Sequence, residues 1–72
     1  MRRFELHRHQ DATGVSGTGV VAEGVVFSTG WVALTWLTAV NSLVFYPSIT
    51  NVEHIHGHGG MTVIVWLDAD GD

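Results

Sequence analysis

Histidines are the side chains of this sequence best suited to metal chemistry. The five are His7, His9, His54, His56 and His58. Three neutral imidazoles can hold a zinc ion and leave a fourth position open for water, so all five are candidate metal ligands with zinc as the cofactor. On a strand, the last three would lie on one face because successive side chains alternate.

The geometry of this set depends on the element formed by residues 48–56. Pro47 ends any preceding strand, Ser48 is a suitable N-cap and Gly57 suits the position after a helix. The apolar residues at helical spacing are Ile49, Val52 and Ile55. We therefore predict a short helix over residues 48–56, with a strand as the alternative. On a helix, His54 and His56 point about 200° apart.

Two other roles for the histidines stay open. His56 would lie near the helix C-terminus, where the helix dipole favours a charged imidazole, and His58 would be exposed in a loop. Because imidazoles titrate just below neutral pH, the cluster is also a candidate pH switch. Glu5 and Glu53 are the carboxylates nearest in sequence to the histidines.

The other sequence motifs give weaker indications of a binding or catalytic site. Residues 14–19 form a glycine-rich turn, but the glycine spacing fits neither phosphate-binding fingerprint and a strand pattern follows instead of a helix. Residues 68–72 resemble the start of a calcium loop, but the later ligands do not follow. No nucleophile motif supports a serine hydrolase, and the sequence predicts no catalytic residues.

Composition narrows the class of protein. With 72 residues the chain forms one small domain, for which we expect an ordered core over residues 3–67 and an acidic tail over 68–72. There is no cysteine, so disulfides and thiolate metal sites are excluded. A net charge of −4 with three arginines and no lysine argues against nucleic-acid binding. The charged N-terminus is not followed by the apolar core of a signal peptide, so we expect a cytoplasmic protein.

The longest apolar stretch, residues 31–46, is best interpreted as a β-hairpin turning near Asn41. Its many β-branched and aromatic residues favour strands over a helix, and polar interruptions make it too short for the roughly 18 apolar residues of a membrane span. In its first arm, Val32, Leu34 and Trp36 share one face. Trp31, Ala33, Thr35 and Leu37 share the other.

Three further strands are predicted. Residues 4–9 alternate as a half-buried strand, which we expect at a sheet edge. Residues 20–27 follow, with Gly24 indicating a bulge or bend, and residues 28–30 fit a three-residue hairpin loop. Residues 61–67 form the last strand. The fold class is therefore mainly β: a small, strongly bent antiparallel sheet or SH3-like partly open barrel of about five strands, with one short helix.

Apolar side chains on both faces of two strands exceed what one helix can cover, so we expect a homodimer or larger oligomer. The candidate interface residues are Trp31, Leu37, Val44 and Tyr46. The leading hypothesis is a non-enzymatic interaction module that binds itself and another protein. The alternative is a histidine-ligated zinc protein.

Two segments resemble a group of small uncharacterised proteins of prokaryotes and phage-like elements. They are TGVSGTGVVAEGV, at residues 13–25, and IHGH with WLD, at residues 55–58 and 66–68. The resemblance implies a compact stand-alone domain of mobile-element origin and implies no activity. If the protein is phage-encoded, we expect its partner to be a host protein. The chain departs from that group at Thr29, where an aspartate is usual, and at Thr35, where a charge is common. His7, His9 and His54 are not part of the shared pattern.

Overall fold

The computed structural model describes residues 1–9, 19–37, 40–56 and 62–69. The elements in chain order are β1 (Arg2–Arg8), β2 (Gly19–Val26), β3 (Val32–Trp36), β4 (Leu43–Tyr46), α1 (Ile49–His56) and β5 (Thr62–Trp66). The glycine-rich turn at residues 14–19 lies outside the described residues except for Gly19, as do His58, Met61 and the end of the acidic tail. No described helix has the length and apolarity to cross a membrane.

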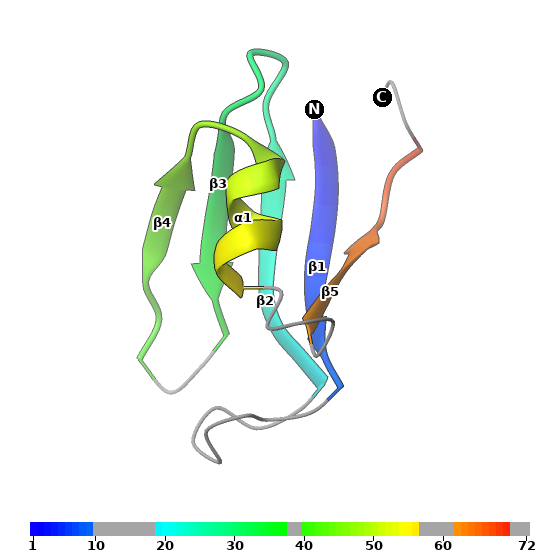
Figure 1. Cartoon of the computed structure of the whole chain (residues 1–72), viewed down its shortest axis with the longest axis vertical. Coiled ribbons are helices and arrows are strands. Elements are labelled where there is room, and N and C mark those ends of the chain that lie inside the picture. The colour runs from blue at the N-terminus through cyan, green and yellow to red at the C-terminus, as the bar shows by residue number, and fades with distance from the viewer. Residues whose placement is uncertain (10–18, 38–39, 57–61, 70–72) are drawn as a thin grey trace.

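The strands form one open antiparallel sheet in the order β4-β3-β2-β1-β5, and α1 lies across one face of it (Figure 1). The mainly β prediction is confirmed, and the sheet is open because β4 and β5 form opposite edges. The expectation that the first strand is an edge is wrong. The last strand returns antiparallel to β1 and covers it, a pairing of distant segments that local alternation does not report.

The core lies between the sheet and α1. Phe4, Leu34 and Val52 have no exposed surface. The remaining core residues are Leu6, Val21, Ala22 and Val32. The alternation predicted for residues 31–37 is confirmed, since Val32 and Leu34 face this core while Trp31 and Leu37 are exposed.

Gly24 has a different role from the one predicted. The β1–β2 register continues through the Phe4–Gly24 pair, and its irregularity lies between Leu6 and His7. A Cβ at Gly24 would lie 2.5 Å from Phe4 Cζ and 2.8 Å from the Ala33 carbonyl oxygen. Glycine is therefore needed here because the Phe4 ring packs against the β2 backbone, not because the strand bulges.

The hairpin loop between β2 and β3 forms as predicted. Phe27 N donates to Trp31 O at 2.8 Å and Gly30 N donates to Phe27 O at 2.9 Å. Gly30 adopts a φ of 95°, a conformation that glycine reaches without steric cost. The loop therefore spans residues 28–30 and directs β3 back along β2.

The predicted helix is also confirmed, from Ile49 to His56. Asn51 N donates to Ser48 O at 3.2 Å, and Ser48 Oγ donates to Asn51 Oδ1 at 3.0 Å at the helix start. Val52 is fully buried, whereas Ile55 is 51% exposed. Thus α1 covers only the central part of one sheet face.

Candidate functional site

The face of the sheet opposite α1, here called the open face, has no covering element among the described residues. The register places three cross-strand rows on it. The first is Leu67, Arg3, Val25, Ala33 and Phe45; the second is Val65, Glu5, Glu23, Thr35 and Leu43; the third is Val63, His7 and Val20. The open face therefore mixes apolar and charged side chains in a fixed pattern.

Charge is concentrated in the middle of the open face and apolar side chains at its margins. Arg3, Glu5, His7 and Glu23 come from β1 and β2, and His7 Nε2 lies 2.9 Å from Glu5 Oε1. Glu5 and Glu23 are directly opposite each other, an arrangement that destabilises an isolated strand pair. A shallow hollow of about 390 Å³ extends from this centre across Val25 and Ala33 to Leu43.

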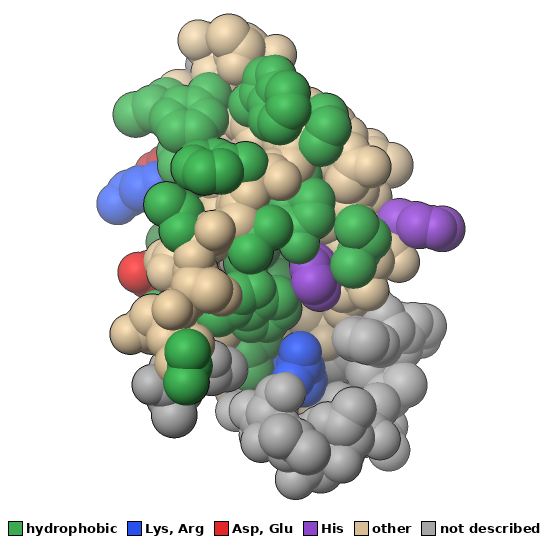
Figure 2. Space-filling model, turned by 90° about the vertical axis from the view of Figure 1, so that its left-hand side faces the viewer, with side chains coloured by type: hydrophobic (Ala, Val, Ile, Leu, Met, Phe, Trp, Pro, Cys, Tyr) green, Lys and Arg blue, Asp and Glu red, His purple; other side chains and the backbone are tan. Residues whose placement is uncertain are grey.

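The apolar margin along β4 is the most exposed. Leu43 is 61% exposed and Phe45 is 60% exposed, and β4 carries no charged residue. Figure 2 views the molecule from this side and shows hydrophobic side chains over much of it. Such a patch, rimmed by polar groups, is typical of a surface that contacts another protein.

The four interface residues predicted from sequence are divided between two environments. Trp31, which directly precedes β3, is 51% exposed, and Leu37, which directly follows it, is 45% exposed. Val44 and Tyr46 are half-buried, and both lie on the face of the sheet that α1 covers. Sequence reasoning missed Leu43 and Phe45, which the β3–β4 register would have indicated because they pair with Thr35 and Ala33.

The histidines are distributed over both sides of the sheet. His7 lies on the open face, whereas His54 and His56 belong to α1 on the other face. His9 and His54 are exposed. In the described ranges, no group of three histidine, aspartate or glutamate side chains could hold a metal ion. Since His58 lies outside those ranges, the five-histidine zinc site stays a prediction.

His56 contacts side chains of the sheet. Its Nε2 lies 2.7 Å from Tyr46 Oη in a hydrogen bond, and its ring packs edge-on against Trp36 at a centroid distance of 4.9 Å. The ring therefore joins the end of α1 to β3 and β4. This contact holds Tyr46 on the α1 side, which fixes Phe45 on the open face.

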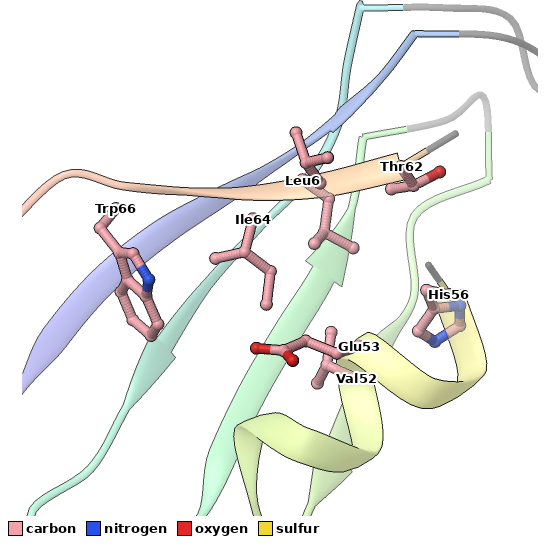
Figure 3. Close-up of a pocket in the computed structure, with 8 residues that line it drawn as sticks. Leu6, Val52, Glu53, His56, Thr62, Ile64 and Trp66 are labelled. Atoms are coloured by element: carbon pink, nitrogen blue, oxygen red, sulfur yellow. The ribbon is translucent and has the colours of Figure 1, made fainter. Parts of the chain in front are cut away.

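A pocket of about 330 Å³ lies between α1 and β5 (Figure 3). Its apolar lining includes Leu6, Val52, Ile64 and Trp66. Its polar lining includes Glu53, His56 and Thr62, and Thr62 Oγ1 accepts a hydrogen bond of 3.4 Å from the buried Arg8. The hydrogen bonds of His56 and Thr62 connect α1 to β4 and β5 to β1, so each wall of the pocket is fixed to a neighbouring strand of the sheet.

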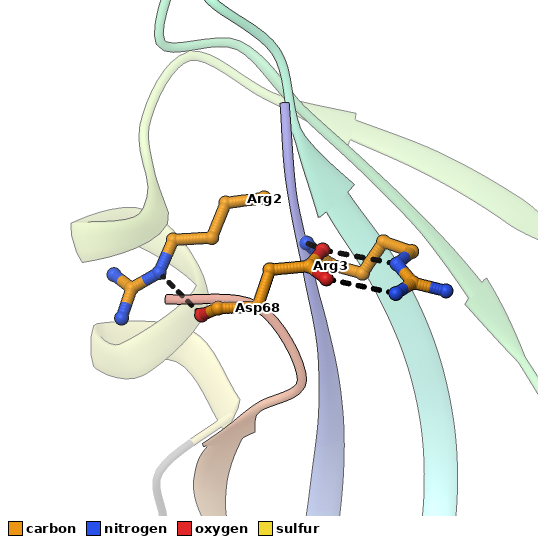
Figure 4. Close-up of polar contacts among 3 residues, drawn as sticks. All are labelled: Arg2, Arg3 and Asp68. Carbon is orange, nitrogen blue, oxygen red and sulfur yellow. Dashed lines mark hydrogen bonds and ion pairs between the residues drawn. The ribbon is translucent and has the colours of Figure 1, made fainter. Parts of the chain in front are cut away.

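The β5 edge is bound to the chain start by charged contacts (Figure 4). Asp68 accepts from Arg3 Nε at 2.9 Å, from Arg3 Nη2 at 2.8 Å and from the Arg3 backbone N at 2.8 Å. These hydrogen bonds lower the pKa of Asp68 to about 2. Arg2 places its guanidinium carbon 3.7 Å from the centroid of Trp66 and donates to the Asp68 carbonyl oxygen at 3.2 Å.

The chain matches a known protein family. No curated protein and no solved structure matches the chain. The family described as Acb5 phage protein matches residues 1–68, which include β1 to β5 and α1 of the described part of the chain. The chain therefore belongs to the Acb5 phage protein family.

Proposed function

We propose that the protein is a phage-encoded, non-enzymatic interaction module that associates with itself and binds a host protein. The observation that carries the proposal is the exposure of Leu43 and Phe45 side by side on β4, an edge strand. Membership of a phage protein family supports a role inside the infected cell, and we place that role in the host cytoplasm.

Leaving the apolar β4 margin, Leu43 and Phe45, in contact with water costs free energy. Each square ångström of apolar surface removed from water contributes roughly 25 cal/mol. A partner that covers Leu43 and Phe45 would also cover the adjoining Ala33 and Thr35 positions on β3. The edge of the open face therefore offers a contiguous area rather than isolated apolar side chains.

The charged centre of the open face supports specificity. Protein interfaces commonly combine an apolar region with a polar rim whose charges select the partner. Here the charges lie in the middle of the open face, inward from the apolar margin of β4, and come from Arg3, Glu5, His7 and Glu23. A host partner would then need an apolar contact for β4 and hydrogen-bonding groups for β1 and β2.

A matched pair of substitutions tests the proposal. Leu43→Glu places a charge in the exposed margin of β4, whereas Ile55→Glu places one at a comparably exposed apolar position on α1. In sedimentation velocity, we expect the wild type and Ile55→Glu to sediment as a dimer or larger species, and Leu43→Glu as a monomer. A wild type that is monomeric at all concentrations would contradict self-association.

The same pair tests the host partner. A host protein that the wild type and Ile55→Glu retain on affinity capture, and that Leu43→Glu loses, would support the proposed binding surface. Retention by all three variants would place the host contact elsewhere on the molecule.

A further inference from the structure

The direction of the backbone groups on β4 follows from the hydrogen bonds of β3. Trp36 N donates to Ser42 O at 3.0 Å, in the same register that pairs Thr35 with Leu43. Hydrogen-bonded and non-hydrogen-bonded pairs alternate along an antiparallel ladder. Val44 and Tyr46 therefore direct their backbone groups to β3, and Leu43 and Phe45 direct theirs outward from the sheet edge.

The direction of the backbone groups on β5, the opposite edge strand, follows from the same rule. Leu67 N donates to Arg3 O at 2.9 Å, so the alternate residues Ile64 and Trp66 direct their backbone groups outward from β5. That edge lies beside the contacts of Arg2 with Trp66 and Asp68. Charged side chains and proline are the usual protection of sheet edges, and neither β4 nor β5 contains one within the strand. The β5 strand differs because the guanidinium of Arg2 lies over its last residue, Trp66.

We propose that two copies of the chain pair through their β4 strands, antiparallel and about a twofold axis at Val44. This inference rests on the self-association in the proposed function and gives it a specific geometry. In this register Leu43 of one copy is opposite Phe45 of the other, and both residues donate and accept across the new pair. The two sheets become one continuous sheet.

The register follows from which residues face outward. Pairing Leu43 with its own counterpart, or Phe45 with its own, would engage only one of these two residues within β4. A shift toward the C-terminal side would bring in Pro47, which has no N–H to donate. Among pairings made within β4 itself, the one centred on Val44 uses the outward groups of both Leu43 and Phe45.

The side chains agree with this arrangement. On the open face, each Leu43 would pack beside the Phe45 of the other copy, so part of the exposed apolar surface of both side chains would become buried at the seam. A twofold axis between antiparallel strands keeps the two open faces on the same side. The dimer would thus present one enlarged open face, with Arg3, Glu5, His7 and Glu23 of each copy still accessible to another partner.

Single cysteines test the register, because the chain contains none. Val44→Cys would place two thiols at a non-hydrogen-bonded pair on the twofold axis, within the roughly 4.4–6.8 Å Cα separation that disulfides need. Phe45→Cys would place them diagonally, at about 7–8 Å or more. On mild oxidation, we expect a disulfide dimer to form at least about tenfold faster for Val44→Cys than for Phe45→Cys.

Amide exchange of the unmodified chain provides a second readout that no substitution can perturb. Raising the protein concentration should slow exchange at the Leu43 and Phe45 amides while leaving Ile64 and Trp66 unchanged. Equal disulfide formation by both variants, or dimers in which the β4 amides stay unprotected, would overturn the pairing and leave self-association standing. A chain that is monomeric throughout would overturn both.

Discussion

The two faces of this sheet both carry apolar side chains but have different surroundings. On the α1 side, Phe4, Leu34 and Val52 are fully buried, whereas on the open face Leu43 and Phe45 are mostly exposed. The difference teaches that a short helix and five strands complete only one core. We expect substitutions on the first face to change folding stability and those on the second to change association.

The largest expected effect is the loss of Phe4. Phe4→Ala removes a fully buried ring that packs edge-on against Trp66 at 5.5 Å, and should lower the free energy of unfolding by about 3–5 kcal/mol. Urea denaturation followed by tryptophan fluorescence measures the change. A loss smaller than that of an exposed-site substitution such as Phe45→Ala would contradict the assignment of the core face.

A smaller loss is expected from adding one methyl group at Gly24. The new Cβ of Gly24→Ala would overlap the Phe4 ring and the Ala33 carbonyl, which should destabilise the fold by about 1–3 kcal/mol. In a Phe4→Leu background the cost should fall, because the smaller side chain removes part of the overlap. A double-mutant cycle with no coupling between the two sites would show that the ring is not the obstacle.

Tyr46→Phe should have a moderate effect on the same face. It removes the hydrogen bond to His56 and should reduce the free energy of unfolding by about 0.5–1.5 kcal/mol. Thermal unfolding of this variant beside His56→Phe would measure the contribution. If the hydrogen bond is responsible, combining both changes should cost less than the sum of the single changes.

The smallest effect is expected at Asp68, beside the β5 edge. Its folded-state pKa of about 2 lies below its ordinary value of 3.8, so its contribution to stability is fully present above pH 4 and is lost as the pH falls toward 2. The melting temperature of Asp68→Asn should therefore lie slightly below that of the wild type at pH 6. The two should converge between pH 4 and pH 2, and a constant difference across that range would rule out the Arg3 contact as its cause.

Features that depend on neighbours in sequence could be predicted. The alternation in residues 31–37, the loop ending at Gly30 and the helix beginning after Ser48 all follow from local residue types, and all are present. The interior position of β1 could not be predicted, because it requires pairing with a strand more than fifty residues away. The role of Gly24 was hidden for the same reason, since Phe4 belongs to a different strand.

The candidate site was only partly predictable. An excess of apolar side chains over what one helix covers indicated an exposed surface, and the exposure of Trp31 and Leu37 agrees with it. The choice of Val44 and Tyr46 instead of Leu43 and Phe45 depended on which side of a four-residue strand meets the helix. That side is fixed by the β3–β4 register and the Tyr46–His56 contact, neither of which the local pattern contains.

Native mass spectrometry of the untagged wild-type chain at micromolar concentration tests the central claim most directly. We expect a dimer or larger assembly whose population rises with concentration and falls when Phe45 is replaced by lysine, with little change in the unfolding free energy of the monomer. A chain that stays monomeric over that range, or a lysine variant that assembles as the wild type does, would contradict the view that the β4 side of the open face is an association surface.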